Sequence, residues 1–358
     1  EQGTAVWSEK ALGNPEDGHA QGAETVVAAA KAVWPNLGAG HAVRVSLAFH
    51  LETAMTLQHQ ITEPCELLDE HGRLTRPGYA VQPLWRYDRK KIKAGWHRIK
   101  EWDYYAILSS ENGYGLTFTI ADLGYIGLAA VCWLDFKTPD AVQYDAFSLL
   151  PMGRTGFPSA SRTGTVAFEN RKLKLSFAVS GHQRVITVDA PGFTAGDGSQ
   201  GLKGTLTLFQ DPSMDTIAIA TSWQENRRAF YYNQKINCMP VRGSVSVGDR
   251  CYNFRPDADF GTLDWGRGNW TYKNRWYWGS ASSLVEGEPV GWNLGYGFSD
   301  RTPATENMIF YRGTAHKLDD VTFHMDTGNY LAPWKITSSD HRFEMDFVPL
   351  VDRHAQTN

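Results

Sequence analysis

The 358-residue chain has few cysteines, little net charge and no long apolar run. Its four cysteines show no CxxC spacing and are too sparse for a disulfide framework. The formal net charge is −4, and the basic residues are scattered, so the composition carries no electrostatic signature of nucleic-acid or anionic-membrane binding. No apolar run approaches the roughly 20 residues that span a bilayer. The sequence therefore predicts no nucleic-acid partner and no membrane span.

Common catalytic and metal-binding motifs are also missing. We find no P-loop, no GxGxxG that opens a helix, no HExxH and no GxSxG. The eleven histidines are dispersed, which predicts neither a metal site nor a cofactor. Residues 1–20 are polar and lack the apolar core of a signal peptide, which favours a cytoplasmic location. Because the first residue is Glu1 rather than Met, a processed leader stays an open alternative.

The residues that are present favour β-structure. Only Glu24–Trp34, which is rich in alanine and followed by Pro35, predicts a helix. The segment 41–57 alternates partly and predicts a strand. From about residue 100, alternating segments recur every 8–12 residues or so, a spacing typical of an all-β sandwich or barrel.

These segments form two series of similar length, over residues 100–223 and 227–350. Closing each sheet on itself would remove exposed strand edges. We therefore predict an all-β protein of two tandem antiparallel barrels with a short N-terminal helical segment. The predicted division is an N-terminal extension (1–60), a first barrel (61–225) and a second barrel that carries the candidate site (226–358).

Several long motifs resemble one known family. In chain order they are ITEPCELLDEHGRL (61–74), KEWDYYAI (100–107), ADLGYIGLA (121–129), NQKINCMPVRGSV (233–245), LDWGRGNWTYKNRWYWGSASS (263–283), GWNLGYGF (291–298), ATENMIFYRGTAHKL (304–318) and APWKITSSDHRFEMDF (332–347). Over about residues 60–350 the chain resembles the DUF2804 family, which has no settled activity. It is similar, more distantly, to AttH-type proteins, carotenoid hydratases and tocopherol cyclase. That resemblance implies two lipocalin-like (calycin) barrels.

The candidate chemistry lies in a group of carboxylates among aromatic residues. In DWGRG, Asp264 and Arg267 stand near Gly266 and Gly268, which permit a bulge or a close backbone approach. Glu306 has no neighbouring cation in the sequence. An apolar pocket would raise the pKa of its carboxyl and make it a general acid, whereas Asp264, held by Arg267, would stay ionised. The predicted catalytic residues are Glu306 and Asp264.

Seven further residues are predicted to bind a substrate. The polar ones would orient substrate oxygens, and the tryptophans would stack on a ring or stabilise a developing cation. They are Arg267, Asn293, Asn307, Lys235, Trp270, Trp276 and Trp278.

A structural interpretation competes at each position. Asp264 and Arg267 would then be a buried pair at a bulge, Glu306 a cap of backbone N–H groups, and the tryptophans core residues. Trp102 with Asp103 would resemble the residue that closes a lipocalin barrel.

Three functions stay open at this point. The first is an enzyme that performs acid/base chemistry (hydration, cyclisation, isomerisation or elimination) on a small amphipathic molecule. The second is a glycoside hydrolase or lyase that uses both carboxylates. The third is a non-catalytic carrier of a lipid or pigment, which requires a mainly apolar pocket. The sequence does not indicate whether the protein is a monomer or an oligomer.

Overall fold

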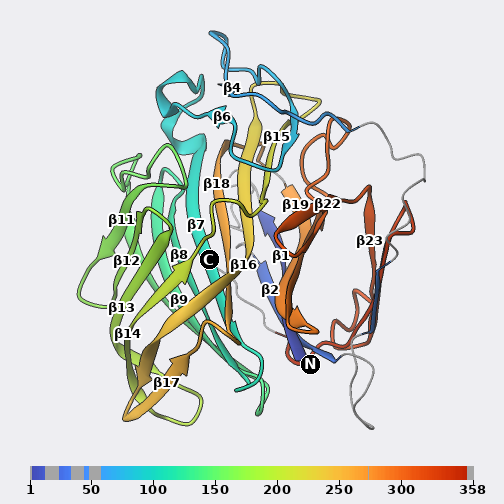
Figure 1. Ribbon diagram of the computed structural model, residues 1–358. Helices are drawn as coiled ribbons and strands as arrows, with labels where there is room; N and C mark the ends of the chain where they lie inside the picture. Colours follow the sequence, from blue (N-terminus) through green and yellow to red (C-terminus); the bar gives the residue numbers. More distant parts are fainter. Residues whose placement is uncertain (1, 13–23, 34–43, 48–57, 273, 353–358) are drawn as a thin grey trace.

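The computed structural model describes residues 2–12, 24–33, 44–47, 58–272 and 274–352, and these are almost entirely antiparallel β-strand. Figure 1 shows a large curled sheet beside a second group of strands that includes β19, β22 and β23. The prediction of an all-β fold built from antiparallel sheets is confirmed. In the described part of the chain, no helix has the length and apolar character needed to cross a membrane.

The large sheet runs in the order β10-β9-β8-β7-β18-β16-β14-β13-β12-β11, with β15, β5 and β17 joined to it. Its strands are β5 (Gly78–Ala80), β7 (Ile99–Ser109), β8 (Tyr114–Asp122), β9 (Ile126–Asp135), β10 (Asp140–Leu149), β11 (Gly164–Glu169), β12 (Lys174–Ser180), β13 (Gln183–Thr194), β14 (Gln200–Phe209), β15 (Ile217–Ser222), β16 (Phe230–Val247), β17 (Arg250–Phe254) and β18 (Phe260–Asn269).

Three smaller sheets complete the fold. A six-stranded sheet has the order β2-β1-β19-β20-β21-β22, and a four-stranded sheet the order β23-β24-β25-β3. Their strands are β1 (Gln2–Leu12), β2 (Glu24–Val33), β3 (Arg44–Leu47), β19 (Asn274–Val285), β20 (Glu288–Tyr296), β21 (Met308–Tyr311), β22 (Thr314–Lys317), β23 (Val321–His324), β24 (Trp334–Ser338) and β25 (Phe343–Phe347). The remaining elements are the paired strands β4 (Cys65–Glu66) and β6 (Trp85–Arg86) and the 3-10 helices η2 (Arg89–Lys91) and η3 (Trp96–Arg98).

The helix predicted at Glu24–Trp34 is wrong over its described part, because Glu24–Val33 form β2 and pair along β1. The helical preference of alanine is local, and a continuous strand ladder outweighs it. Trp34 lies outside the described residues. Of the strand predicted within 41–57, the structure describes β3 (Arg44–Leu47), which pairs with β25.

Alternation of side chains builds the core of the large sheet. Along β13, the alternate residues Arg184, Ile186, Val188 and Ala190 are buried. This is the period of two that a strand with one face on a core requires. Glycine also occupies turns where a positive φ angle is needed, with φ +78° at Gly313 between β21 and β22.

Strand pairing does not follow the division predicted at residues 225/226. β16 and β18 lie beyond that boundary, yet they pair with β14 and β7. β16 is long enough to pair with β15 and β18 along its first half and with β14 and β17 along its second. The domain boundaries stay a prediction.

A bulge in β16 fastens the large sheet to the six-stranded sheet. The register of β16 on β18 shifts between Ile236 and Met239, and Cys238 takes a φ of +57°. The amide nitrogen of Asn237 lies within hydrogen-bond distance of the Ala281 carbonyl on β19 (2.9 Å) and the Trp292 carbonyl on β20 (3.1 Å). One buried amide therefore contacts two strands of the facing sheet.

Replacing this amide tests its role. We expect Asn237→Ala to lower the free energy of unfolding by about 2 kcal/mol, because buried carbonyl groups lose their donor. Urea unfolding measures the change. Asn253→Ala, at an exposed position on β17, is the matched control and should change stability by less than about 0.5 kcal/mol. Equal effects of the two substitutions would contradict the assignment.

Candidate active site

A row of polar side chains follows one face of β16. Tyr231, Asn233, Lys235 and Asn237 are two residues apart, so they share the face that meets the six-stranded sheet. Tyr232, Gln234 and Ile236 occupy the opposite face, and Gln234 there bonds Ser161 and Thr216. The candidate site is built on the first of these faces.

Lys235 is the centre of the site. Its side chain is only 3% exposed, and its ammonium lies 2.8 Å from Oδ2 of Asp264 and 3.6 Å from Oε2 of Glu306. The ammonium also lies over the ring of Trp278, 4.7 Å from its centroid. A lysine is almost never buried this deeply unless it is paired. Here it is paired with one carboxyl from β18 and another from the segment that precedes β21.

Asp264 lies opposite Lys235 in the pairing of β16 with β18, which explains their contact. Its other oxygen, Oδ1, accepts hydrogen bonds from Nδ2 of Asn233 (2.6 Å) and Nε1 of Trp102 (3.2 Å). Two neutral donors and one ammonium therefore surround this carboxylate.

Glu306 comes from the segment that precedes β21. Asn293 holds its backbone, because Nδ2 of Asn293 donates to the Glu306 carbonyl at 2.8 Å. The carboxyl also lies against Gly295, where a Cβ atom would stand 2.2 Å from Oε1 of Glu306. A side chain at this position of β20 would displace the Glu306 carboxyl.

The pKa of the Glu306 carboxyl is raised, mainly by burial, although the Lys235 ammonium opposes this shift. The hydroxyl of Tyr231 lies 3.4 Å from Oε2 of Glu306, and burial raises the pKa of Tyr231 far above its ordinary value. Tyr231 is therefore a proton-bearing donor beside this carboxyl. One ammonium and two carboxyls reach charge balance when one carboxyl keeps a proton, and burial favours the protonated form at Glu306.

Aromatic rings wall the site on one side. Trp102 stacks on Tyr231 (centroids 6.3 Å apart) and meets Trp270 edge to face (5.1 Å). Phe298 packs on Tyr231, Trp270 and Trp276. Trp270 and Trp276 thus lie in a ring cluster that adjoins the carboxylates, whereas Trp278 contacts Lys235 directly.

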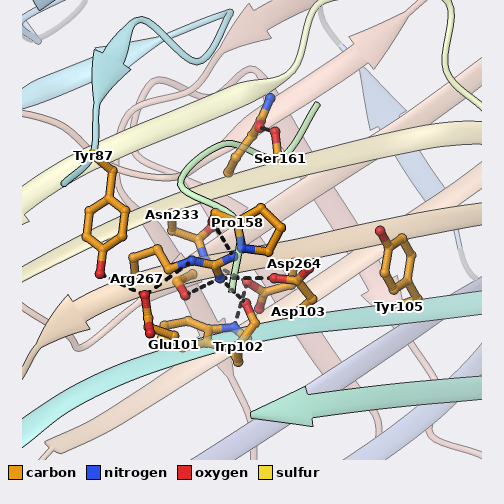
Figure 2. A network of polar contacts seen from close by, with 12 residues as sticks. Tyr87, Glu101, Trp102, Asp103, Tyr105, Pro158, Ser161, Asn233, Asp264 and Arg267 are labelled. Atoms are coloured by element: carbon orange, nitrogen blue, oxygen red, sulfur yellow. Dashed lines mark hydrogen bonds and ion pairs between the residues drawn. The ribbon is translucent and has the colours of Figure 1, made fainter. Parts of the chain in front are cut away.

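Arg267 does not hold Asp264, contrary to the expectation from DWGRG. Residues three apart on a strand face opposite sides, so Arg267 points into the interior of the large sheet. There its Nη1 donates to Oδ1 of Asp103 at 2.9 Å, and its guanidinium lies 3.9 Å from the centre of the Trp265 ring. Figure 2 shows this network, with Glu101 and Pro158 also close to Arg267.

The glycines of DWGRG make room for rings and produce no bulge. β18 pairs continuously with β7 and β16 through Gly266 and Gly268. A Cβ atom on Gly266 would lie 1.9 Å from the Trp102 ring, and one on Gly268 would lie 2.7 Å from Nε1 of Trp270. These two residues are glycine because tryptophan rings cover the backbone there.

Asn293 and Asn307 differ in their relation to the site. Oδ1 of Asn293 accepts from Nε1 of Trp278 (2.7 Å), which joins it to the Lys235 contact. Asn307 is fully buried and bonds the backbone, accepting from Gly295 and donating to Asp319 (both 2.8 Å). Its side chain thus links the residues before β21 to β20 and to the backbone at Asp319.

A cavity of about 540 Å³ lies beside the segment that carries Glu306. Thr305 and Trp223 are among its lining residues. Phe298 packs on Trp223 (4.9 Å between centroids) and on Tyr231 (4.8 Å), whereas Asp264, Lys235 and Glu306 are not among the lining residues. Small-molecule sites commonly have volumes of about 300–1,000 Å³.

No group of three or more His, Cys, Asp or Glu side chains among the described residues is placed to hold a metal ion. The groups that converge on Lys235 are two carboxyls, a phenol and an amide. This arrangement can donate, accept and pass protons.

Comparison with known proteins identifies the family. The family model described as "Domain of unknown function (DUF2804)" matches residues 58–358. The chain belongs to the DUF2804 family. No curated protein matches this DUF2804 chain. The predicted resemblance is confirmed, and its extent is slightly larger than the 60–350 expected.

Similar solved structures include three that match two thirds or more of this chain at low identity. An AttH of Nitrosomonas europaea is 11% identical, with a TM-score of 0.41 over 76% of this chain and 99% of that chain. Kievitone hydratase of Nectria haematococca is 12% identical, with a TM-score of 0.37 over 67% and 72% of the two chains. CghA is 11% identical, with a TM-score of 0.43 over 88% and 86%. AttH-type and hydratase structures are thus among those found, as the resemblance implied.

The structure therefore brings Asp264, Glu306, Lys235, Asn293 and Trp278 together. It places Arg267 on the other face of β18. Three residues of the site were not predicted in their present roles, namely Trp102, Tyr231 and Asn233. The sequence could have indicated Tyr231 and Asn233, because alternate residues of a strand share a face and Lys235 was already a predicted site residue.

The raised pKa of Glu306 predicts a pH-dependent stability. Because burial raises this pKa in the folded state, the folded protein binds the proton more tightly than the unfolded chain does. Stability should therefore fall as the pH rises above 4.5, the ordinary value, and level off once the pH passes the folded pKa. Glu306→Gln removes this contribution, so the wild type should lose stability relative to the variant across that window.

Urea unfolding at a series of pH values from 4.5 to neutrality measures this difference. Glu344→Gln, at an exposed position on β25, is the matched control and should run parallel to the wild type. A Glu306→Gln profile that also runs parallel to the wild type would show that Glu306 titrates normally.

Proposed function

We propose that this protein is an enzyme that performs acid/base chemistry on a small molecule at the Asp264–Lys235–Glu306 site. The observation that carries the proposal is the sharing of one buried ammonium by two carboxyls with different surroundings. Pairs of titratable groups whose environments differ in this way are the usual source of separate acid and base roles.

In the proposed reaction, Glu306 gives its proton to the substrate and Asp264 accepts one from the substrate or from an attacking water. The Lys235 ammonium touches both carboxyls, so it can return the proton from Asp264 to Glu306 and restore the starting state. Hydration, elimination, isomerisation and cyclisation all need one proton delivered and one removed. The proposal covers this group of reactions.

The surrounding residues support a small, partly apolar substrate. Trp102, Tyr231 and Trp270 supply aromatic surface beside the carboxyls. The side-chain oxygen of Asn233 is buried and has no hydrogen-bond partner among the described residues. It supplies an acceptor for a substrate hydroxyl, because its amide nitrogen is already used by Asp264.

No comparable observation supports the other two functions, a glycoside hydrolase or lyase and a non-catalytic carrier. A glycoside hydrolase needs the sugar between its two carboxyls. Here the Lys235 ammonium lies between them. A carrier needs a mainly apolar lining, whereas Asp264 and Glu306 face inward with side chains only 15% and 12% exposed.

Mass spectrometry of compounds that copurify with the untreated protein is the first test, since it identifies candidate substrates. If the protein converts one of these compounds, kcat is then measured with that compound. We expect Glu306→Gln and Asp264→Asn each to lower kcat by about 10²- to 10⁴-fold, the range for loss of a general acid or base. Glu169→Gln, at an exposed position on β11, is the matched control. Wild-type turnover in both site variants would refute the proposal.

A further inference from the structure

Exposed apolar side chains gather at one end of the large sheet. Six of the eight large apolar side chains that are exposed among the described residues lie there. They are Trp96, Tyr125, Phe147, Leu149, Leu150 and Met152, and we call them the apolar patch. Isolated exposed apolar residues are normal, but a contiguous group of this kind marks an interaction site.

Strand pairing explains why these residues meet. The start of β7, the end of β8, the start of β9 and the end of β10 lie at the same end of the sheet, with Ile126 opposite Leu149. In Figure 1 this edge is where the turquoise segment with η2 and η3 enters β7. The backbone N–H of Leu150 donates to the Tyr125 carbonyl (2.9 Å), and that of Met152 donates to the Gly124 carbonyl (3.0 Å).

The Trp96 segment closes the group. A Cβ atom on Gly124 would lie 2.5 Å from the Trp96 carbonyl oxygen and 2.8 Å from Cα of His97. The 3-10 helix η3 is therefore packed directly on the β8–β9 turn. Three separate segments of the chain form one surface.

The backbone at the tip of the patch is strained. Leu150 and Met152 have φ angles of +51° and +52°, in the left-handed region that favours glycine or asparagine. Their side chains are 47% and 37% exposed, and that of Leu149 is 81% exposed. Neither the backbone conformation nor the exposure of these side chains stabilises the isolated chain. Such strain with no local benefit is typical of functional surfaces.

Basic side chains surround the patch. Residues 89–100 contain six Lys or Arg and no Asp or Glu. The ammonium of Lys100 lies 4.6 Å from the centre of the Tyr125 ring, and Arg154 donates to the Leu150 carbonyl. The nearby carboxylate of Glu101 is already paired with Arg89 (2.9 Å) and with Arg267. Arg89 and Lys91 of this segment are paired with Glu101 and Glu66, so the exposed cation at the tip of the patch is Arg154.

We propose that this end of the large sheet is a docking surface for an anionic lipid bilayer. The apolar patch would enter the interfacial region, and the surrounding Lys and Arg side chains would contact lipid phosphates. A nucleic acid fits the charge but not the aliphatic tip formed by Leu149, Leu150 and Met152, since nucleic acids are bound through stacking and hydrogen bonds. The expectation of no anionic-membrane signature rested on the small net charge and the scattered basic residues, whereas the patch is assembled from three separate segments of the chain.

Cosedimentation of the full-length protein with lipid vesicles tests the proposal. We expect binding to vesicles of phosphatidylcholine mixed with phosphatidylglycerol, and much weaker binding to phosphatidylcholine alone. The double variant Leu150→Asn, Met152→Asn should reduce the partition coefficient by about tenfold or more, because two apolar side chains leave the interface. Arg154→Gln should reduce it by about fivefold, as expected for one basic residue near the surface.

The controls separate loss of docking from loss of folding. Asparagine adopts a positive φ more readily than leucine or methionine, so the double variant should unfold at the wild-type temperature or above it. Leu331→Asn and Lys172→Gln change exposed residues elsewhere and should bind vesicles like the wild type.

Three results would overturn the proposal. One is absence of wild-type binding to the anionic vesicles. Another is wild-type binding by the folded double variant. The third is binding of duplex DNA, or self-association in sedimentation velocity, that the double variant abolishes while vesicle binding is unaffected.

Discussion

The burial of one lysine ammonium constrains the centre of this molecule. Lys235 is nearly inaccessible to water, and removing a charge from water is costly unless opposite charges surround it. Asp264 supplies a carboxylate from the same sheet at 2.8 Å, and Glu306 adds a carboxyl at 3.6 Å from the segment before β21. These contacts join the segment before β21 to the large sheet, and Asn237 makes a second connection to the six-stranded sheet two residues further along β16.

The same strands carry a second buried cation on their other face. Arg267 is paired with Asp103, and its guanidinium stacks on Trp265 inside the large sheet. Asp264 and Arg267 are near neighbours in sequence but belong to different networks, because strand residues alternate between faces. On each face of β18, a carboxylate, a cation and a tryptophan thus lie together. Only the group around Asp264 and Lys235 contacts the six-stranded sheet, through Trp278. This division distinguishes the proposed catalytic groups from the residues that stabilise the interior of the large sheet.

The proposed reaction and the proposed docking surface depend on different parts of the fold. The first uses the interface between sheets, where burial raises the pKa of Glu306. The second uses turns at the end of the large sheet, where Leu150 and Met152 are exposed on a strained backbone. The two sites have no residue in common.

The sequence by itself determined the β-rich composition, the glycine turns such as Gly313, the family and the presence of Asp264, Glu306 and Lys235 in one group, since these depend on local patterns and motifs. It failed at Glu24–Val33, where pairing with β1 outweighs the helical preference of alanine. Only the tertiary structure decided that Lys235, and not Arg267, is the partner of Asp264. The partner of a charged side chain depends on which strand lies alongside and on which face of the sheet the side chain lies. The spacing of residues along one strand specifies neither.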